Sequence, residues 1–368
     1  MRSEECGWLV SRWSFVRVAR LSAAFVRQSR PWTTLLVKAS NRLAVSFQLN
    51  DSPIPHRAAA RLAVISGNRG GWFAGAPDQQ VVGIDFAGPQ KALQQRKKIL
   101  AVAALRLGPK AYEVSADGLN ARLLETPSGW TAHELAESLV QLSPRASVVA
   151  CDFPFSIPDP LIKSSAFAAL ANHPTAFGSW QSFNEFICTT VALSCPVDLV
   201  RFAAWKHSDN WTRRSSDVAT GAQPPLKHQY QVLFNMTLLG NAFLGRLRSS
   251  GLFDVVPFDS RGRSAMIEIY PGHAMRVLGV PNYKRAPQVA IAAILESLES
   301  KGVSITVDRR IRNVCETYNT GKGASSDHDA ADAFVALCLG ILHREGLATE
   351  FLGADPDARE VEGAIWSI

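Results

Sequence analysis

Short, strongly apolar runs that end in an acid constrain the fold of this chain more than any other feature. Three such runs place Asp85 in Val81–Gly88, Asp152 in Val148–Pro154 and Glu268 in Met266–Pro271. Runs of this length and composition predict buried β-strands. Carboxylates are rarely buried unless they are paired or bind a metal. The runs therefore predict a sheet whose acidic strand ends share one cation site.

The order of the predicted elements indicates a mixed sheet. A meander of strands comes first, followed by a helix that a capping box at Thr131 and Glu134 opens, and then by another strand. The predicted strands are 81–86, 99–105, 112–116 with 122–124, and 147–151, and the helix is 132–142. Strands and helices in this order predict an α/β fold with a mixed sheet covered by helices.

The rest of the chain divides into a leader, an insertion and a return to the sheet. Residues 1–80 are rich in Arg and predict a poorly ordered extension, with a mitochondrial-type transit peptide as the alternative. Residues 153–264 are rich in Pro and aromatics, with one long helix near 226–248, and predict a helical insertion in a domain that spans 81–368. A strand at 265–270 and helices at 288–300 and 329–343 complete that domain.

The net charge of +7 does not by itself indicate a nucleic-acid partner. Residues 1–80 hold 11 Lys and Arg against 4 Asp and Glu, whereas residues 81–368 hold 28 of each. The excess charge belongs to the leader, and the main body is neutral. Six cysteines without a C-x-x-C pair, and no apolar run of about 18 residues, predict a protein of the reducing cytoplasm with no membrane span.

Four of the acids form a candidate metal site. Asp329 and Asp332 are three residues apart at a predicted helix start, so both extend from one face of that helix. Asp85 and Asp152 end two strands that are neighbours in a sheet of this order. An oxygen-only ligand set selects Mg²⁺ or Mn²⁺, and two such ions about 3.5–4 Å apart can hydrolyse a phosphodiester bond. The alternative for each Asp alone is a turn or helix-cap residue.

These motifs carry a family resemblance. Residues 81–368 resemble the predicted nucleases called domain of unknown function 429, in the ribonuclease H-like superfamily. The resemblance rests on Gly83–Gly88, Asp152–Pro158, Ile267–Pro271 and Asp329–Ala333. The last two, with Lys284 between them, are also similar to the C-terminal half of RuvC-type Holliday junction resolvases. The resemblance implies a ribonuclease H-like, five-stranded mixed sheet with flanking helices and a helical insertion.

The resemblance also implies roles for individual residues. Asp85, Asp152, Asp329 and Asp332 would be the catalytic ligands of two Mg²⁺ or Mn²⁺ ions, with Asp85 bridging them. Glu268 would have a supporting role, orienting Lys284 or lining the cleft, and Lys284 would hold a substrate phosphate. His328 adjoins Asp329 and is a candidate for proton transfer, with a surface or capping role as the alternative.

A segment that interleaves bases with aromatics is the candidate substrate contact. Lys206, Arg213 and Arg214 would grip phosphates, while Trp211 or Trp205 would stack on a base. The alternative is a surface loop in which Arg214 pairs with Asp217.

The leading functional hypothesis is a metal-dependent nuclease with nucleic acid as substrate. A phosphotransferase or ATPase of the actin-like fold is the second hypothesis, since Gly83–Asp85 resembles the first phosphate segment of that fold. A nucleic-acid-binding protein without catalysis is the third. Mg²⁺-dependent ATP binding would favour the second, and absence of specific Mn²⁺ binding would favour the third.

Overall fold

The computed structural model of the chain comprises two compact units, 1–74 and 75–368. The described residues are 44–46, 63–65, 80–86, 95–96, 98–125, 129–142, 146–193, 202–207, 212–227, 231–261, 264–317, 328–352 and 358–368. In the first unit, β1 (Ala44–Ser46) pairs antiparallel with β2 (Ala63–Ile65). The rest of the predicted extension, 1–80, lies almost entirely outside the described residues.

The second unit is built on one mixed sheet, as the sequence predicts for an α/β protein. Strands β3, β4 and β5 form an antiparallel meander, and β6 then pairs parallel to β3, with β8 parallel to β6. The bounds are β3 Gln80–Phe86, β4 Ile99–Gly108, β5 Ala111–Val114, β6 Ala146–Asp152 and β8 Ser264–Ile269.

The sequence predicts five strands, which is too few, because the described residues form a sheet of nine. At one edge, β9 (Ser304–Val307) is added beside β5; beyond β8 lie β11 (Ile365–Ser367) and β10 (Thr349–Phe351), and β7 (Phe253–Val255) also pairs with β8. Short strands at the chain's end and in the insertion carry little periodicity, so their pairing depends on neighbours distant in sequence.

Residues 122–124 belong to a 3-10 helix, η1 (Gly118–Leu124), and not to the strand predicted there. The buried Asn120 explains the turn. Its side-chain oxygen accepts from the Ala103 backbone N–H, and its amide nitrogen donates to the Ala103 and Ser115 carbonyls. One side chain therefore satisfies backbone groups that would otherwise need a partner strand.

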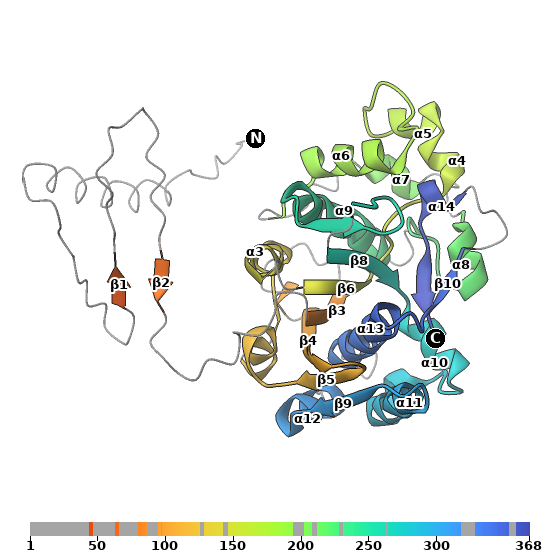
Figure 1. Cartoon of the computed structure of the whole chain (residues 1–368). Coiled ribbons are helices and arrows are strands. Elements are labelled where there is room, and N and C mark those ends of the chain that lie inside the picture. Colours follow the sequence, from red (N-terminus) through yellow and green to blue (C-terminus); the bar gives the residue numbers. More distant parts are fainter. Residues whose placement is uncertain are drawn as a thin grey trace, which may run out of the picture. The chain divides into compact units, whose positions relative to one another are not determined.

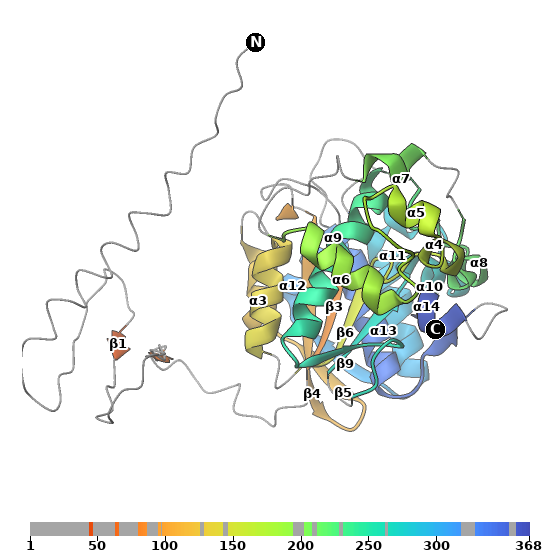
Figure 2. The same cartoon turned by 90° about the horizontal axis from the view of Figure 1, so that it is seen from above.

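Helices cover both faces of the sheet, with a hydrophobic core on each (Figures 1 and 2). One face carries α3 (Ala132–Leu142), α6 (Trp180–Thr190) and α9 (Gln231–Ser249). The other carries α11 (Pro287–Ser300), α12 (Arg309–Thr317) and α13 (Asp329–Arg344). The predicted helices at 132–142, 288–300 and 329–343 are confirmed to within a residue, and the one near 226–248 begins at 231.

The remaining elements lie mostly in the predicted insertion. It contains α4 (Asp159–Ile162), α5 (Ser165–Ala169), α6, α7 (Ala203–His207), α8 (Ser215–Thr220), α9 and β7. Outside it, α10 (Pro271–Val277) and η3 (Tyr283–Arg285) follow β8, and α14 (Arg359–Glu362) precedes β11. Within the described part of the chain, no helix has the length and apolar character needed to cross a membrane.

The alternation of side chains along β3 decides what faces α13. Val82, Ile84 and Phe86 belong to the core beneath α3 and α9, whereas Val81 belongs to the core beneath α13. Because side chains alternate along a strand, Gly83 and Asp85 share the α13 face with Val81. A Cβ on Gly83 would overlap the backbone of Ala333 and Leu337 in α13. Glycine at this position therefore lets the helix lie directly on the strand.

Candidate metal centre

Three carboxylates converge where β3, β6 and α13 meet. Asp85 and Asp152 are direct register partners on neighbouring parallel strands. Asp332 comes from the first turn of α13, the helix that Gly83 allows to approach. Each of the three offers an oxygen within 4.8 Å of the others. The sequence prediction that these acids come together is thus met for three of the four.

The spacing of these oxygens suits one hard divalent ion. Two oxygens bound to Mg²⁺ at about 2.1 Å can be at most about 4.2 Å apart, when they lie on opposite sides of the ion. The three oxygens lie within 4.8 Å of one another, which is somewhat wider than this maximum. Neighbouring oxygens around such an ion are closer, at about 3 Å, so the three side chains would have to move towards one another on binding. The donors are all carboxylate oxygens, which favours Mg²⁺ or Mn²⁺ over the softer, nitrogen- and sulfur-binding metals.

The cluster carries negative charge in a buried place, and its pKa values reflect this. Burial raises the pKa of Asp85 well above its usual range, and the charges of Asp329, Asp332 and Asp152 raise it further. Burial and the Asp332 charge likewise raise the pKa of Asp152. Without a bound cation, ionisation of these carboxylates therefore costs free energy. A bound divalent ion would compensate their negative charge and remove that cost.

Asp332 is oriented by two neighbours from η3. The Tyr283 hydroxyl donates to Asp332 Oδ1 at 2.5 Å, and Lys284 Nζ lies 3.0 Å from Oδ2. Asp332 is 2% exposed and Tyr283 4%, while the Lys284 side chain is 56% exposed. The Asp332 charge raises the pKa of Lys284, so this amine is a firm cation. Tyr283 therefore holds the Asp332 carboxylate from the buried side, and Lys284 pairs with it from the solvent-exposed side.

Asp329 lies beside the cluster and has a cationic partner of its own. Its Oδ2 lies 3.0 Å from Lys98 Nζ, and it is not one of the three converging acids. Burial raises the pKa of Asp329 to about 6. Its charge nevertheless acts on Asp85, so it borders the site. His328 is the half-buried N-cap residue of α13, and its carbonyl accepts from the Asp332 N–H.

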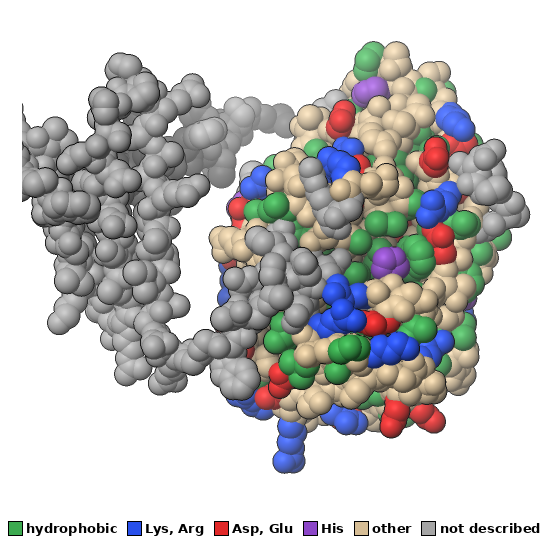
Figure 3. All heavy atoms as spheres, in the orientation of Figure 1, with side chains coloured by type: hydrophobic (Ala, Val, Ile, Leu, Met, Phe, Trp, Pro, Cys, Tyr) green, Lys and Arg blue, Asp and Glu red, His purple; other side chains and the backbone are tan. Residues whose placement is uncertain are grey.

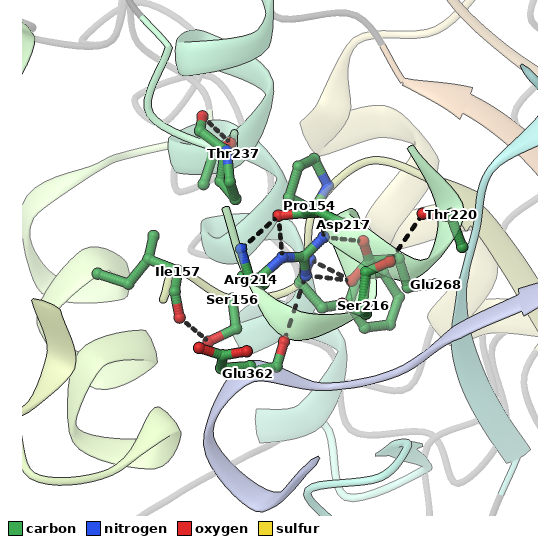
Figure 4. A network of polar contacts seen from close by, with 12 residues as sticks. Pro154, Ser156, Ile157, Arg214, Ser216, Asp217, Thr220, Thr237, Glu268 and Glu362 are labelled. Carbon is green, nitrogen blue, oxygen red and sulfur yellow. Dashed lines mark hydrogen bonds and ion pairs between the residues drawn. The ribbon is translucent and has the colours of Figure 1, made fainter. Parts of the chain in front are cut away.

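Glu268 does not orient Lys284, contrary to one of its predicted roles. Its neighbours Ile267 and Ile269 belong to the core beneath α13, whereas Met266 belongs to the opposite core. Alternation therefore turns Glu268 to the face away from Asp85. There it binds Arg214, with Oε1 at 2.5 Å from Nη2 and Oε2 at 2.7 Å from Nη1 (Figure 4).

Arg214 is buried, which corrects its prediction as a substrate-binding residue. It is 1% exposed and donates to both oxygens of Asp217, both oxygens of Glu268 and the Glu362 carbonyl. These bonds use all the N–H groups of the guanidinium. The pairing with Asp217 was foreseen as an alternative, but at the surface. Glu268 also accepts from the Phe155 N–H, so this network holds the loop that follows Asp152.

The other predicted substrate contacts are dispersed. Arg213 is exposed, Trp211 lies outside the described residues, and Lys206 lies in α7 with a side chain that is not described. Trp205 is buried and stacks on Phe167 with ring centroids 4.4 Å apart, so it cannot stack on a base. On the coloured face of Figure 3, basic and acidic side chains are interspersed, in line with the neutral charge of residues 81–368.

Tyr283 and Lys98 are site neighbours that sequence reasoning missed. Tyr283 sits beside Lys284, yet a lone Tyr in a loop has no pattern to mark it. Lys98 falls in the basic stretch Lys91–Lys98, in which no single residue stands out. Its pairing with Asp329 joins residues 231 positions apart, and nothing local in the sequence indicates it.

Comparison with known proteins adds no assignment. No family model matches the chain, and neither a curated protein nor a solved structure matches it.

Proposed function

We propose that this chain is a metal-dependent nuclease of ribonuclease H-like fold that hydrolyses phosphodiester bonds with Mg²⁺ or Mn²⁺. The observation that carries the proposal is the convergence of Asp85, Asp152 and Asp332 within 4.8 Å. An antiparallel meander whose first strand pairs parallel with the strand after α3 is in keeping with such a fold. The motif resemblance of residues 83–88 and 329–333 points the same way.

The residues present divide the work between holding cations and holding phosphate. Asp85, Asp152 and Asp332 would hold one ion. With Asp85 bridging, Asp329 would complete the shell of a second ion once its carboxylate is released from Lys98. Bound divalent ions polarise the scissile phosphate and activate the attacking water. Lys284 is a firm cation with an exposed side chain, so it can turn from Asp332 towards a substrate phosphate.

Tyr283 and the Arg214 network would keep the ligands in place. The Tyr283 hydroxyl fixes one oxygen of Asp332 and leaves that carboxylate a limited choice of orientations. Glu268 fixes the backbone at Phe155, three residues after Asp152. Preorganised ligands of this kind lose little freedom when substrate binds.

Digestion of labelled single-stranded DNA, duplex DNA and RNA in Mg²⁺ and in Mn²⁺ tests the proposal. We expect cleavage by the wild type and a loss of at least about 1,000-fold in Asp85→Asn, because the substitution removes a ligand charge and keeps the shape. Glu137→Gln is the matched control, since Glu137 forms an exposed pair with Arg246. Absence of cleavage by the wild type, or equal cleavage by Asp85→Asn, would overturn the proposal.

A further inference from the structure

A small pocket opens beside the metal centre and shares Asp152 with it. The pocket has a volume of about 180 Å³ and lies at the carboxyl ends of β6 and β8, where α8 and α9 meet them. Asp152 is half-buried and belongs both to the pocket lining and to the three converging acids. A group in this pocket would therefore be in reach of a phosphate bound at the metal centre.

The pocket is the wrong place for an anion. Three carboxylates line it, those of Asp152, Asp217 and Glu268, against the single guanidinium of Arg214. Every N–H of that guanidinium is already donated to Asp217, Glu268 or the Glu362 carbonyl (Figure 4). A phosphate would meet net negative charge and no spare donor from Arg214, so it would be repelled.

The remaining walls suit a flat, uncharged ring with polar edges. Apolar surface comes from Phe153, Leu233, Met236 and Ile269, while Gln223 and Asp152 place polar atoms at the lining. Leu233 and Met236 are half-buried lining residues three positions apart on α9. Flipped nucleobases are bound in this way, between apolar side chains and with hydrogen bonds to their polar edge.

The volume matches one ring system and excludes a larger group. A cavity of about 150 Å³ holds benzene, whereas pockets for drug-sized ligands begin at about 300 Å³. At about 180 Å³ the pocket accommodates a base and leaves the sugar and phosphate outside. The phosphate is then free to reach the metal centre, which is the arrangement that hydrolysis requires.

We infer that this pocket binds one unpaired nucleobase of the substrate, so that the site takes single-stranded nucleic acid or free nucleotides and not intact duplex. The inference rests on the proposed function for the identity of its ligand. A base within a duplex is stacked and paired, and extruding it costs free energy. That cost is absent in a single strand.

Binding without divalent metal separates this inference from the nuclease proposal. Saturation-transfer NMR of the full chain with cytidine or adenosine reports base binding alone. We expect both nucleosides to bind the wild type and Asp332→Asn, and neither to bind Met236→Trp, which fills the pocket. Val289→Trp introduces the same indole side chain on α11, where Val289 is 47% exposed, and should bind like the wild type. Leu233→Trp is the second pocket variant, should Met236→Trp fail to fold.

Fluorescence anisotropy in Ca²⁺ then identifies the source of the base. We expect a labelled single strand to bind the wild type at least tenfold more tightly than the duplex of the same sequence, and Met236→Trp to abolish that preference. A nucleoside monophosphate that competes as well as a five-nucleotide strand would identify free nucleotides as the source. The inference would be overturned if nucleosides fail to bind the wild type, or if they bind Met236→Trp as well as the wild type. Either result would count even if the enzyme cleaves nucleic acid.

Discussion

Two groups of buried acids in this molecule have their negative charge compensated in different ways. The Arg214 network holds Asp217 and Glu268 around one guanidinium, with the Phe155 N–H as a further donor to Glu268. The candidate metal centre holds Asp85, Asp152 and Asp332 within 4.8 Å, with the half-exposed Lys284 on one side. The three acids lie at the carboxyl ends of β3 and β6 beside α13, whereas Glu268 extends from β8 on the other face of the sheet, and Asp152 lines a pocket with both Glu268 and Arg214.

The difference between them lies in where the compensating charge comes from. In the Arg214 network the cation is covalently part of the chain and its donors are fully used, so the network is complete without a ligand. At the metal centre, four carboxylates including Asp329 face two lysine amines among the described residues, Lys98 and Lys284. A deficit of two positive charges in a buried site is what one divalent ion supplies.

Removing the internal cation should cause the largest change in stability. Arg214→Met leaves Asp217 and Glu268 buried without their partner, so we expect the free energy of unfolding to fall by about 3–5 kcal/mol. Urea denaturation followed by circular dichroism measures it. Arg246→Met is the control, because Arg246 forms an exposed pair with Glu137 and should change stability by less than about 1 kcal/mol. A fall of similar size in both variants would contradict the comparison.

Removing an acid from the metal centre should affect cation binding and spare the metal-free fold. Asp332→Asn keeps its shape but loses a ligand charge, so we expect Mn²⁺ affinity to fall at least about 100-fold, or about 2.7 kcal/mol. Isothermal titration calorimetry of wild type and variant measures this. Asp217→Asn, in the Arg214 network, should bind Mn²⁺ like the wild type once it is folded. Unchanged Mn²⁺ affinity in Asp332→Asn would rule out this carboxylate as a ligand.

The effect of Mn²⁺ on thermal stability should depend on pH. The pKa of Asp329 rises from 3.8 to about 6 on folding, and those of Asp85 and Asp152 are also raised. An acid whose pKa is raised by folding is protonated in the folded state at low pH. Its contribution to the free energy of unfolding is therefore lost as the pH rises from the unfolded-state pKa to the folded-state pKa, from about 4 to 6 for Asp329.

Metal binding opposes this cost, because only ionised carboxylates coordinate. We expect saturating Mn²⁺ to raise Tm by about 5 °C or more at pH 8, and by clearly less at pH 5, as differential scanning calorimetry would measure. Asp85→Asn removes one of the three ligands and should flatten this dependence. A rise in Tm that is equal at both pH values would indicate binding elsewhere.

Substitution of Lys284 should have the smallest effect on activity. Its side chain is half exposed, so solvent can also stabilise a nearby phosphate. Lys284→Gln removes the cation proposed to reach the substrate phosphate, so we expect kcat/KM for nucleic acid to fall about tenfold, corresponding to about 1.4 kcal/mol. Arg285→Gln, the exposed neighbour in η3, is the matched control. Steady-state kinetics of the two variants would distinguish a specific phosphate contact from a general loss of positive charge.

Periodicity accounts for what could be predicted of the fold. The apolar runs at 81–86, 99–105 and 265–270 and the helices at 132–142 and 329–343 are long enough for local pattern to identify them. The capping box of α3 is present, with the Thr131 N–H donating to Glu134 and the Glu134 N–H donating to the Thr131 hydroxyl. Strands of three or four residues, such as β7 and β11, have too few residues for a pattern.

The position of an acid in the candidate site could be predicted where that position follows from the acid's own strand or helix. Asp85 and Asp152 end neighbouring strands, and both follow from the order of those strands. Glu268 ends a strand as well, but its face depends on a register that pairs it with Cys151. Because a one-residue change in register reverses the face of every side chain, sequence alone could not place Glu268 with Arg214.

By itself, the sequence determined which segments form the central strands and helices, and that acids end them. This information is local, because apolar periodicity and helix caps act within a few residues. Tertiary structure decided which of the predicted acids do share a site, and which cation each of the others meets. Asp332 reaches Asp85 because Gly83 lets α13 lie on β3, and Glu268 meets Arg214 because alternation turns it to the other face. Charges buried together must be balanced, and that balance depends on groups far apart in the chain.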